Sequence, residues 1–166
     1  MKKLALFTAV ALMITMLFCA CSGENANSSD NGPAENTKTL TQVFEDIKSQ
    51  VELNDFNEYT KTSSLDRFYG ITEDQIEEFA GGINSSGVNQ EEIVLIKAVD
   101  KAAADSVKTA LDRRYDSKVA QNKNYNQEQA AMVEKCKVEQ NDLYVSLIVS
   151  ENAEKITSIY KNDLGL

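Results

Sequence analysis

The first strong periodic pattern in the chain lies at residues 40–52. Its apolar side chains recur three or four positions apart, as on one face of a helix: Leu40, Val43, Phe44, Ile47 and Val51. Thr39 stands three residues before Gln42, which is the spacing of a capping box. The pattern therefore predicts a helix over 40–52. A polar stretch follows through Thr62, and residues 64–71 then predict a single helical turn that ends at Gly70.

Two segments in the middle of the chain predict β structure. Residues 92–99 are apolar on both faces at their centre, which indicates a strand buried within a sheet. Residues 75–83 fit either a helix or a strand, but Gly81-Gly82 disfavours the helix, so we expect a strand. Residues 84–87, Asn-Ser-Ser-Gly, predict the turn between the two segments.

The second half of the chain repeats this order. Residues 101–123 return to helical spacing and predict a long helix, and residues 127–131 predict one further helical turn. Two alternating segments, 132–139 and 143–150, flank Gln140-Asn141-Asp142 and predict a β-hairpin.

The order of these elements predicts an α+β domain, in which an N-terminal helix precedes two ββα units. The second unit ends in an amphipathic helix over 151–162. Two hairpins favour one four-stranded antiparallel sheet, and we expect the helices to pack on one face of it.

The N-terminus has the three parts of a secretory signal. Lys2 and Lys3 precede an apolar run from Leu4 to Phe18, and Ala20 stands before Cys21. In bacterial lipoproteins the cysteine after the cut carries diacylglycerol and fatty acids such as palmitate. We therefore expect residues 1–20 to be removed and Cys21 to be lipidated.

Two alternatives to this prediction are weaker. A retained transmembrane helix needs about 20 apolar residues, and this run is bounded by Glu24 soon after the cysteine. Cleavage before Cys19 would place the bulky Phe18 where a small residue is required. Because two acyl chains hold a protein on a membrane, the expected location is the outer face of the bacterial cytoplasmic membrane.

The residues after the anchor divide into a tether and a domain. Residues 21–38 are polar and contain Pro33, the only proline. Such a segment buries too little apolar surface to offset the conformational entropy lost on ordering. We expect residues 39–166 to form a single α+β domain, because that length suffices for one hydrophobic core.

Charge and cysteine content exclude several functions. The net charge is −9, and the signal contains two lysines and no acid, so the mature chain stands at −11. Nucleic-acid binding is disfavoured, because it requires clustered Lys and Arg. The chain has no histidine, which excludes a thiol-histidine nucleophile and the usual Cys and His zinc site. With Cys21 lipidated, Cys136 is left alone, and we expect it to pack as a small apolar side chain.

Several short motifs resemble a family of small lipoproteins from clostridia and their relatives, known as a domain of unknown function (DUF4358). The resemblance covers most of residues 65–160 and rests on Tyr69-Gly70-Ile71, Glu92-Ile93-Val94-Leu95-Ile96-Lys97, Leu111 with Arg114, Tyr125-Asn126-Gln127-Glu128 and Tyr144-Val145. The chain has Gln127 and Asp142 where members usually have proline and glycine. The resemblance implies a lipid-anchored extracytoplasmic domain and brings no activity, cofactor or ligand.

Two groups of charged residues are candidates for binding. Six acids around the first hairpin could converge on calcium, although a solvated acidic edge explains them as well: Glu73, Asp74, Glu77, Glu78, Glu91 and Glu92. The long helix has basic residues that could meet lipid phosphates or wall polymers, or could pair with nearby acids: Lys108, Arg113, Arg114 and Lys118.

Three tyrosines are the remaining candidates. Tyr115, Tyr125 and Tyr144 combine apolar area with a hydrogen-bonding tip, which suits a sugar or peptide groove. At helix and strand spacing, however, such tyrosines more often belong to the core or its rim.

No nucleophile with its base, no cofactor motif and no singled-out carboxylate pair occurs in the sequence. We therefore expect a non-enzymatic protein-interaction or accessory module of an envelope complex. The alternative is a module that binds a small solute or a divalent metal. A hydrolase would require two carboxylates facing each other across a cleft.

Overall fold

A computed structural model describes residues 38–166, apart from the side chains of residues 124 and 125. The predicted signal peptide, the attachment site Cys21 and residues 21–37 of the predicted tether lie outside this range. Within it, no helix is both long and apolar enough to cross a membrane.

Helix α1 (Leu40–Gln50) begins at the predicted capping box. The Gln42 N–H donates to Thr39 Oγ1 at 3.2 Å, and the Thr39 N–H donates to Gln42 Oε1 at 2.9 Å. These two bonds satisfy amide groups that a helix start leaves open. The buried side of α1 holds the apolar residues Leu40, Val43, Phe44 and Ile47, as its periodicity predicts.

The remaining elements alternate between helices and strands. In chain order they are β1 (Phe56–Glu58), α2 (Thr62–Tyr69), the 3₁₀ turn η1 (Glu73–Gln75), β2 (Ile76–Asn84), β3 (Glu92–Ala98), α3 (Lys101–Tyr125), α4 (Gln127–Val133), β4 (Lys137–Asn141), β5 (Tyr144–Val149) and α5 (Ala153–Leu164). The predicted turn at Gly70 is confirmed, since this residue ends α2 with φ 71°.

The sheet has five strands, not the four that the sequence predicts. Its order is β1-β2-β3-β5-β4, and every neighbouring pair is antiparallel. The missed strand is β1, which lies in the segment expected to be only polar. Its three residues pair with β2 through main-chain bonds, and so short a strand leaves no alternation to detect.

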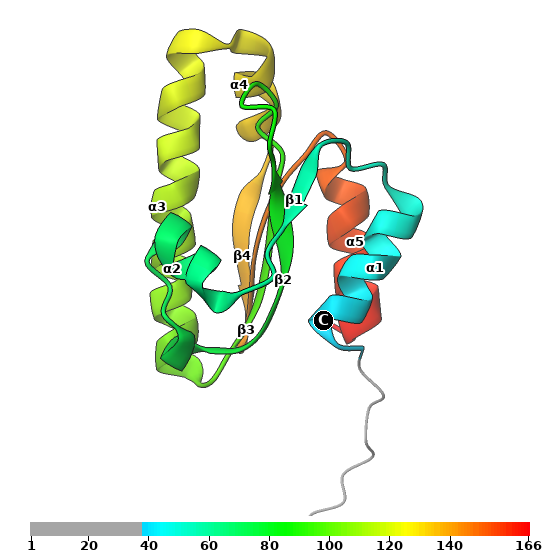
Figure 1. Ribbon diagram of the computed structural model, residues 1–166, viewed down its shortest axis with the longest axis vertical. Coiled ribbons are helices and arrows are strands. Elements are labelled where there is room, and N and C mark those ends of the chain that lie inside the picture. Colours follow the sequence, from blue (N-terminus) through cyan, green and yellow to red (C-terminus); the bar gives the residue numbers. More distant parts are fainter. Residues whose placement is uncertain (1–37) are drawn as a thin grey trace, which may run out of the picture. The chain divides into compact units, whose positions relative to one another are not determined.

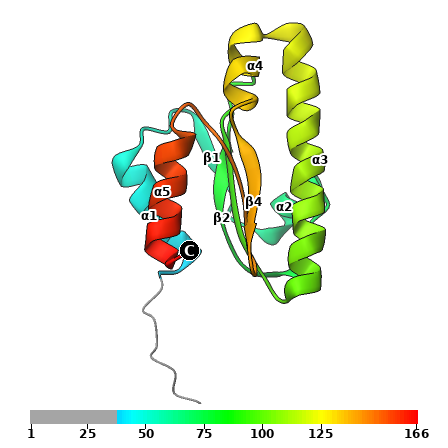
Figure 2. The ribbon, with the colours of Figure 1, turned by 180° about the vertical axis from the view of Figure 1, so that it is seen from behind.

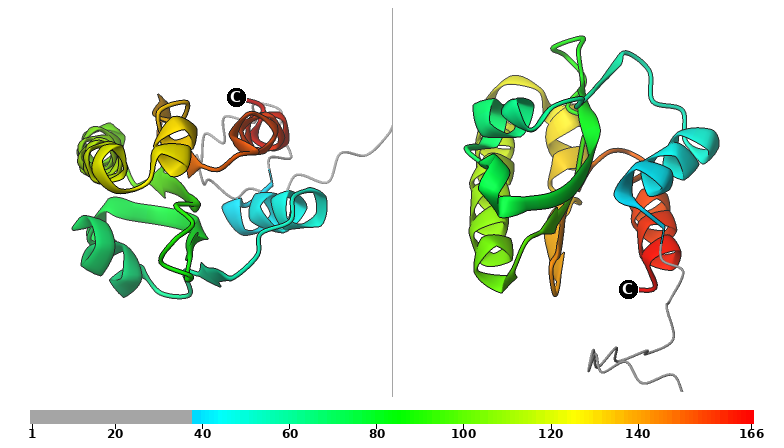
Figure 3. Two further views of the ribbon diagram at one scale, coloured as in Figure 1. Left: turned by 90° about the horizontal axis from the view of Figure 1, so that it is seen from above. Right: turned by 60° about the horizontal axis from the view of Figure 1, so that its bottom comes forward.

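The prediction that all helices pack on one face is wrong. Helices α2, α3 and α4 cover one face of the sheet, and α1 and α5 cover the other (Figures 1 and 3). A helix does follow each hairpin, but α3 and α5 lie on opposite faces. The reason lies in β3, whose side chains are apolar in both directions, so that each face needs a cover.

The predicted strand over 75–83 is confirmed as β2, and its glycines have a packing role. A Cβ at Gly81 would stand 2.0 Å from the main-chain oxygen of Ile93, and one at Gly82 would stand 2.3 Å from that of Asn57. The close approach of β1 and β3 to β2 therefore requires glycine at both positions.

The predicted strand over 132–139 is wrong at its start. Met132 and Val133 end α4, which begins where the Asn126 side chain accepts from the Gln129 N–H at 3.2 Å. The strand itself is β4, and it continues through Gln140 and Asn141, which the sequence assigns to the turn. The turn is shorter than expected because it consists of Asp142 and Leu143 alone.

Candidate functional site

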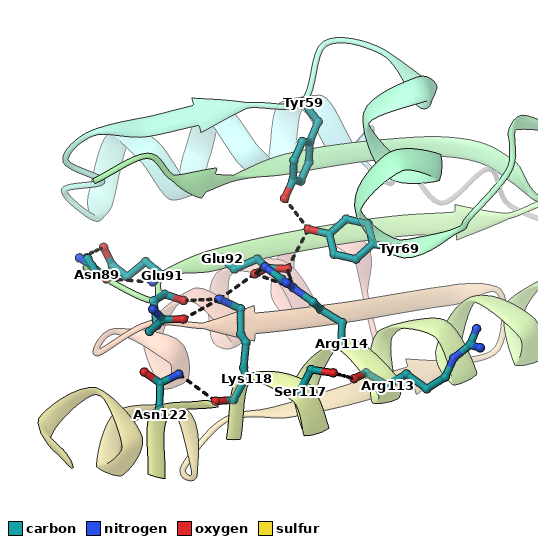
Figure 4. Close-up of polar contacts among 11 residues, drawn as sticks. Tyr59, Tyr69, Asn89, Glu91, Glu92, Arg113, Arg114, Ser117, Lys118 and Asn122 are labelled. Carbon is teal, nitrogen blue, oxygen red and sulfur yellow. Dashed lines mark hydrogen bonds and ion pairs between the residues drawn. The ribbon is translucent and has the colours of Figure 1, made fainter. Parts of the chain in front are cut away.

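The most deeply buried group of paired charged side chains in the described residues lies around Glu92. This residue opens β3 and is completely buried. Its carboxylate binds Arg114 in a bidentate manner, with Nε 3.0 Å from Oε1 and Nη2 2.8 Å from Oε2. Lys118 Nζ lies 2.8 Å from Oε2. Arg114 and Lys118 are one turn apart on α3, so both reach the same carboxylate (Figure 4).

Two tyrosines approach the carboxylate from the segment between β1 and β2. The Tyr69 hydroxyl donates to Glu92 Oε1 at 2.8 Å and is itself hydrogen-bonded to the Tyr59 hydroxyl. Tyr69 is the last residue of α2, and Tyr59 is fixed by its N–H, which donates to the Gly81 carbonyl at 2.9 Å. We call these five residues the Glu92 cluster: Tyr59, Tyr69, Glu92, Arg114 and Lys118.

A second set of hydrogen bonds surrounds the cluster. Lys118 Nζ also donates to the Gln90 carbonyl at 3.0 Å, and the Asn122 side chain donates to the Lys118 carbonyl at 2.8 Å. The neighbouring acid Glu91 is held separately, by the Ser150 hydroxyl at 2.7 Å and by the Asn89 amide at 3.1 Å. Each buried acid therefore has its own partners.

The electrostatics keep Glu92 ionised. Burial opposes the charge on Glu92, but hydrogen bonds and charge from Arg114 and Lys118 outweigh it and hold the pKa of Glu92 below its ordinary value. Burial lowers the pKa of Lys118, although Glu92 counteracts it. One carboxylate thus faces two cations.

The chemistry available to this cluster is limited. Four donor atoms occupy the two oxygens of Glu92, namely Arg114 Nε and Nη2, Lys118 Nζ and the Tyr69 hydroxyl. Burial also raises the pKa of Tyr59 and of Tyr69, so both phenols keep their protons at neutral pH. The arrangement fastens β3, α2 and α3 together and leaves no free lone pair for acid or base catalysis.

The predicted basic patch on the long helix is divided. Arg113 is exposed, whereas Arg114 and Lys118 point inward to Glu92. Lys108 pairs with Asp112 at 2.7 Å. The alternative, in which these bases pair with nearby acids, is what the structure shows for all but Arg113.

The three candidate tyrosines do not line one described groove. Tyr115 packs at the edge of the core beneath α3, and Tyr144 packs at the edge of the core beneath α1 and α5. These positions lie on opposite faces of the sheet. The side chain of Tyr125 lies outside the described part of the structure.

The six candidate acids likewise do not converge. Glu92 and Glu91 are buried with the partners given above, and Glu77 pairs with Lys97 at 2.7 Å. Within residues 38–166, no group of three or more Asp, Glu, Cys or His side chains is placed to hold a metal ion. The prediction for Cys136 is confirmed: the side chain is 6% exposed within the core, and its thiol donates to the Met132 carbonyl at 3.3 Å.

Sequence reasoning missed the roles of Tyr59, Tyr69, Glu92 and Lys118 as one cluster. A signal for part of it was present, because a single acid begins an otherwise apolar strand and two bases stand four residues apart on the longest helix. That an acid and two bases meet inside the core could be suspected from this pattern. The contribution of the tyrosines could not.

The hollows of the described surface include one at α1 and one beside Gln90 and Asn122, and further grooves lie along β4 and α5. One of about 440 Å³ lies between these two elements, and an adjoining one of about 350 Å³ continues along β4 to Leu166. A third, of about 600 Å³, lies between α4 and the start of α5. Charged side chains of both signs line all three.

Comparison with known families gives one match. The family model described as "Domain of unknown function (DUF4358)" matches residues 49–150, which is more than half of the chain. The match includes all five strands, α2 to α4 and the whole Glu92 cluster, and it leaves out α5 and nearly all of α1. No curated protein and no solved structure gave a match.

Proposed function

The chain belongs to the DUF4358 family, and from this premise we propose that it is a lipid-anchored extracytoplasmic domain that binds another protein of the cell envelope. The family description names no reaction and no ligand. Support for this role comes from the sequence of the N-terminus and from the surfaces that the domain offers.

The anchor is supported by the order of residues around Cys21. Ala20 provides the small residue before the cut, and Lys2, Lys3 and the apolar run precede it. Diacylglycerol on Cys21 would hold the chain at a membrane surface by two acyl chains. The described domain starts at Lys38, which pairs with Asp163 near the end of α5 at 2.8 Å, so both ends of the domain lie together.

The anchor can be tested with matched cysteine variants. Cells are labelled with an alkyne analogue of palmitate, and the protein is fractionated with the membrane. We expect wild type and Cys19→Ala to be labelled and membrane-bound, and Cys21→Ala to lose both properties. Labelling that survives in Cys21→Ala, or that disappears in Cys19→Ala, would contradict the assignment.

The interaction role is supported by one observation above the others. The chemically richest group, the Glu92 cluster, is buried apart from the Arg114 side chain, which is 26% exposed, whereas two adjoining grooves run along the edge strand β4. A small-molecule site typically gathers convergent polar groups inside a mainly apolar cavity. The charged grooves beside β4 fit a polypeptide better than a small solute.

Covalent capture on intact cells tests this role. The native lipoprotein is crosslinked and purified beside the Cys21→Ala variant at equal expression. We expect one envelope protein to be recovered with wild type only, and reciprocal capture through that protein to recover this chain. If the two samples yield the same proteins, the interaction role is wrong, and solute and cation screens on the mature chain become the next step.

A further inference from the structure

We propose that an extended, acidic segment of the partner protein adds to the free edge of β4 as a sixth strand of the sheet. This inference rests on the interaction role proposed above and states where the partner binds and by which chemistry.

The main chain of β4 has hydrogen-bonding groups that β5 does not use. The Leu143 carbonyl accepts from the Ala98 N–H at 2.9 Å, so residue 143 points toward β3. Main-chain direction alternates along a strand, and even-numbered residues of β5 therefore bond to β4. Their partners are Lys137, Glu139 and Asn141. Val138 and Gln140 consequently direct their N–H and C=O groups outward.

The two edges of the sheet differ in what they offer. The β1 edge has three residues, Phe56–Glu58, and α2 is the next element along the chain. The β4 edge has five residues, and Figure 2 shows β4 at the front of the sheet with α5 on one side and α3 on the other. Added strands bind edges of this kind through the main chain. The β4 edge is the better template.

A groove follows the β4 edge on its α5 side. The two adjoining hollows of about 440 and 350 Å³ share Lys137, Glu139, Ser146 and Lys161. We call their combined course the edge groove. Because alternate side chains of an added strand point to the same face, every second side chain of the segment would enter the edge groove.

Charge in the edge groove selects acidic side chains. Lys135, Lys137 and Lys161 line it, against Glu139 and Glu154. Glu139 is engaged by both Lys137, at 2.5 Å, and Lys161, at 2.7 Å, and these bonds hold the pKa of Glu139 below its ordinary value. The groove therefore has a small excess of positive charge in a strongly acidic chain.

A second copy of this chain is a poorer occupant. Each mature copy carries a large negative charge, so two copies repel each other over their whole surfaces. The negative charge of this chain also repels an acidic partner, but acidic side chains of that partner would contact the lysines of the edge groove. A second copy of β4 would instead place its own lysines against those of the groove.

The test is a peptide selection on the full mature chain in detergent micelles. Random octapeptides displayed on phage are selected on wild type, and the enriched peptides are measured against Gln140→Pro and Gln140→Ala. Both variants lose the glutamine side chain, but only proline loses the outward N–H, and it breaks no bond to β5. We expect acids at alternate positions and affinity at least about tenfold weaker for Gln140→Pro than for Gln140→Ala.

A second variant, changed only in a side chain, tests the proposal even if Gln140→Pro does not fold. Lys137 is 73% exposed, so Lys137→Glu should leave the fold intact. We expect it to weaken acidic peptides by about tenfold. Enriched peptides without alternate acids, or affinities unaffected by both substitutions, would overturn the proposal. A mature chain that sediments as a dimer, and that Gln140→Pro turns into a monomer, would assign the edge to a second copy and overturn it as well.

The outcomes separate this proposal from the proposed function. If reciprocal capture of a partner in cells is unchanged by Gln140→Pro, the interaction role is supported and the β4 edge is not its binding site. If peptides bind at β4 but no partner is captured in cells, the edge site is supported and the interaction role in the envelope is wrong.

Discussion

The two faces of the sheet are stabilised by different physics. On the α1 and α5 face the core consists of apolar side chains, including Leu95, Ile148 and Ile156. On the α2 and α3 face the core also contains the Glu92 cluster, in which the Arg114 side chain is partly exposed. An apolar core loses stability in proportion to the area removed from it. A buried ion cluster depends on every partner being present, because one deletion leaves an uncompensated charge.

A single strand contributes to both faces. Along β3, Glu92, Val94 and Ile96 point to the ion-containing core, whereas Ile93 and Leu95 point to the apolar one. Substitutions at successive positions of β3 therefore test apolar burial on one face and the pairing of a buried charge on the other, within the same strand.

The largest effect should come from removing the cover of the apolar face. A fragment limited to residues 49–150, the range of the family match, lacks α5 and nearly all of α1. These helices bury seven apolar side chains, namely Leu40, Val43, Phe44, Ile47, Ile156, Tyr160 and Leu164. Each contributes about 1.5–3 kcal/mol, so the seven together contribute about 10–21 kcal/mol, which matches or exceeds a typical stability of about 5–15 kcal/mol. We expect circular dichroism to show no cooperative unfolding of the fragment.

The matched control for that fragment is residues 38–166, which should unfold cooperatively. A fragment of residues 49–150 with a sharp thermal transition would mean that α1 and α5 are dispensable, and it would break the comparison between the two faces.

The next effect concerns the ion cluster. Glu92→Gln keeps the shape of the side chain and removes its charge, which leaves Arg114 and Lys118 without a counter-ion. We expect a loss of about 3–5 kcal/mol in the free energy of unfolding, measured in urea. Glu77→Gln removes an exposed acid from the neighbouring strand and should cost less than about 1 kcal/mol. Equal losses for the two variants would show that burial of the charge is irrelevant.

The pH dependence of stability should distinguish the two faces even where two substitutions lower the free energy of unfolding by similar amounts. The folded-state pKa of Glu92 lies below its ordinary 4.5, so this group stabilises the fold above pH 4.5. That contribution is lost as the pH falls through the folded-state pKa. The deficit of Glu92→Gln relative to wild type should therefore shrink below about pH 4.5.

Leu95→Ala provides the comparison from the apolar face. It should lose about 2–5 kcal/mol at every pH, because no ionisable group contributes to the contact. Urea titrations of the three proteins between pH 3 and 7 measure both deficits. A pH-dependent deficit for Leu95→Ala, or a constant one for Glu92→Gln, would contradict the assignment.

The smallest effect should come from the tyrosines. Tyr69→Phe removes one of the four donors to Glu92 and also leaves the Tyr59 hydroxyl without its partner. We expect a loss of about 1–3 kcal/mol, and a smaller one for Tyr59→Phe, which does not touch the carboxylate. The double variant should lose less than the sum of the single losses, since the two hydroxyls share one hydrogen bond. Additive losses would show that the tyrosines act independently.

The sequence could predict most elements of the fold. The capping box at Thr39, the strand of β3 and the long helix α3 follow from patterns within a few residues, and local geometry alone produces such patterns. The sequence could not predict β1, because Phe56–Glu58 belongs to the sheet only through main-chain bonds to β2. It also placed Met132 and Val133 in a strand, since a short apolar run does not distinguish a helix end from a strand start.

The sequence by itself determined most of the local elements, because these depend on residues that are neighbours in the chain. It also determined the acidic charge and the absence of histidine, and it predicts lipidation of Cys21. Only the tertiary structure decided that helices cover both faces and that Tyr59, Tyr69, Glu92, Arg114 and Lys118 meet in one buried cluster. It also decided that β4 lies at one edge of the sheet and that Tyr115 and Tyr144 lie on opposite faces of it. The physical reason is that burial and ion pairing depend on distances in space between segments far apart in the chain, and periodicity records only the orientation of each segment.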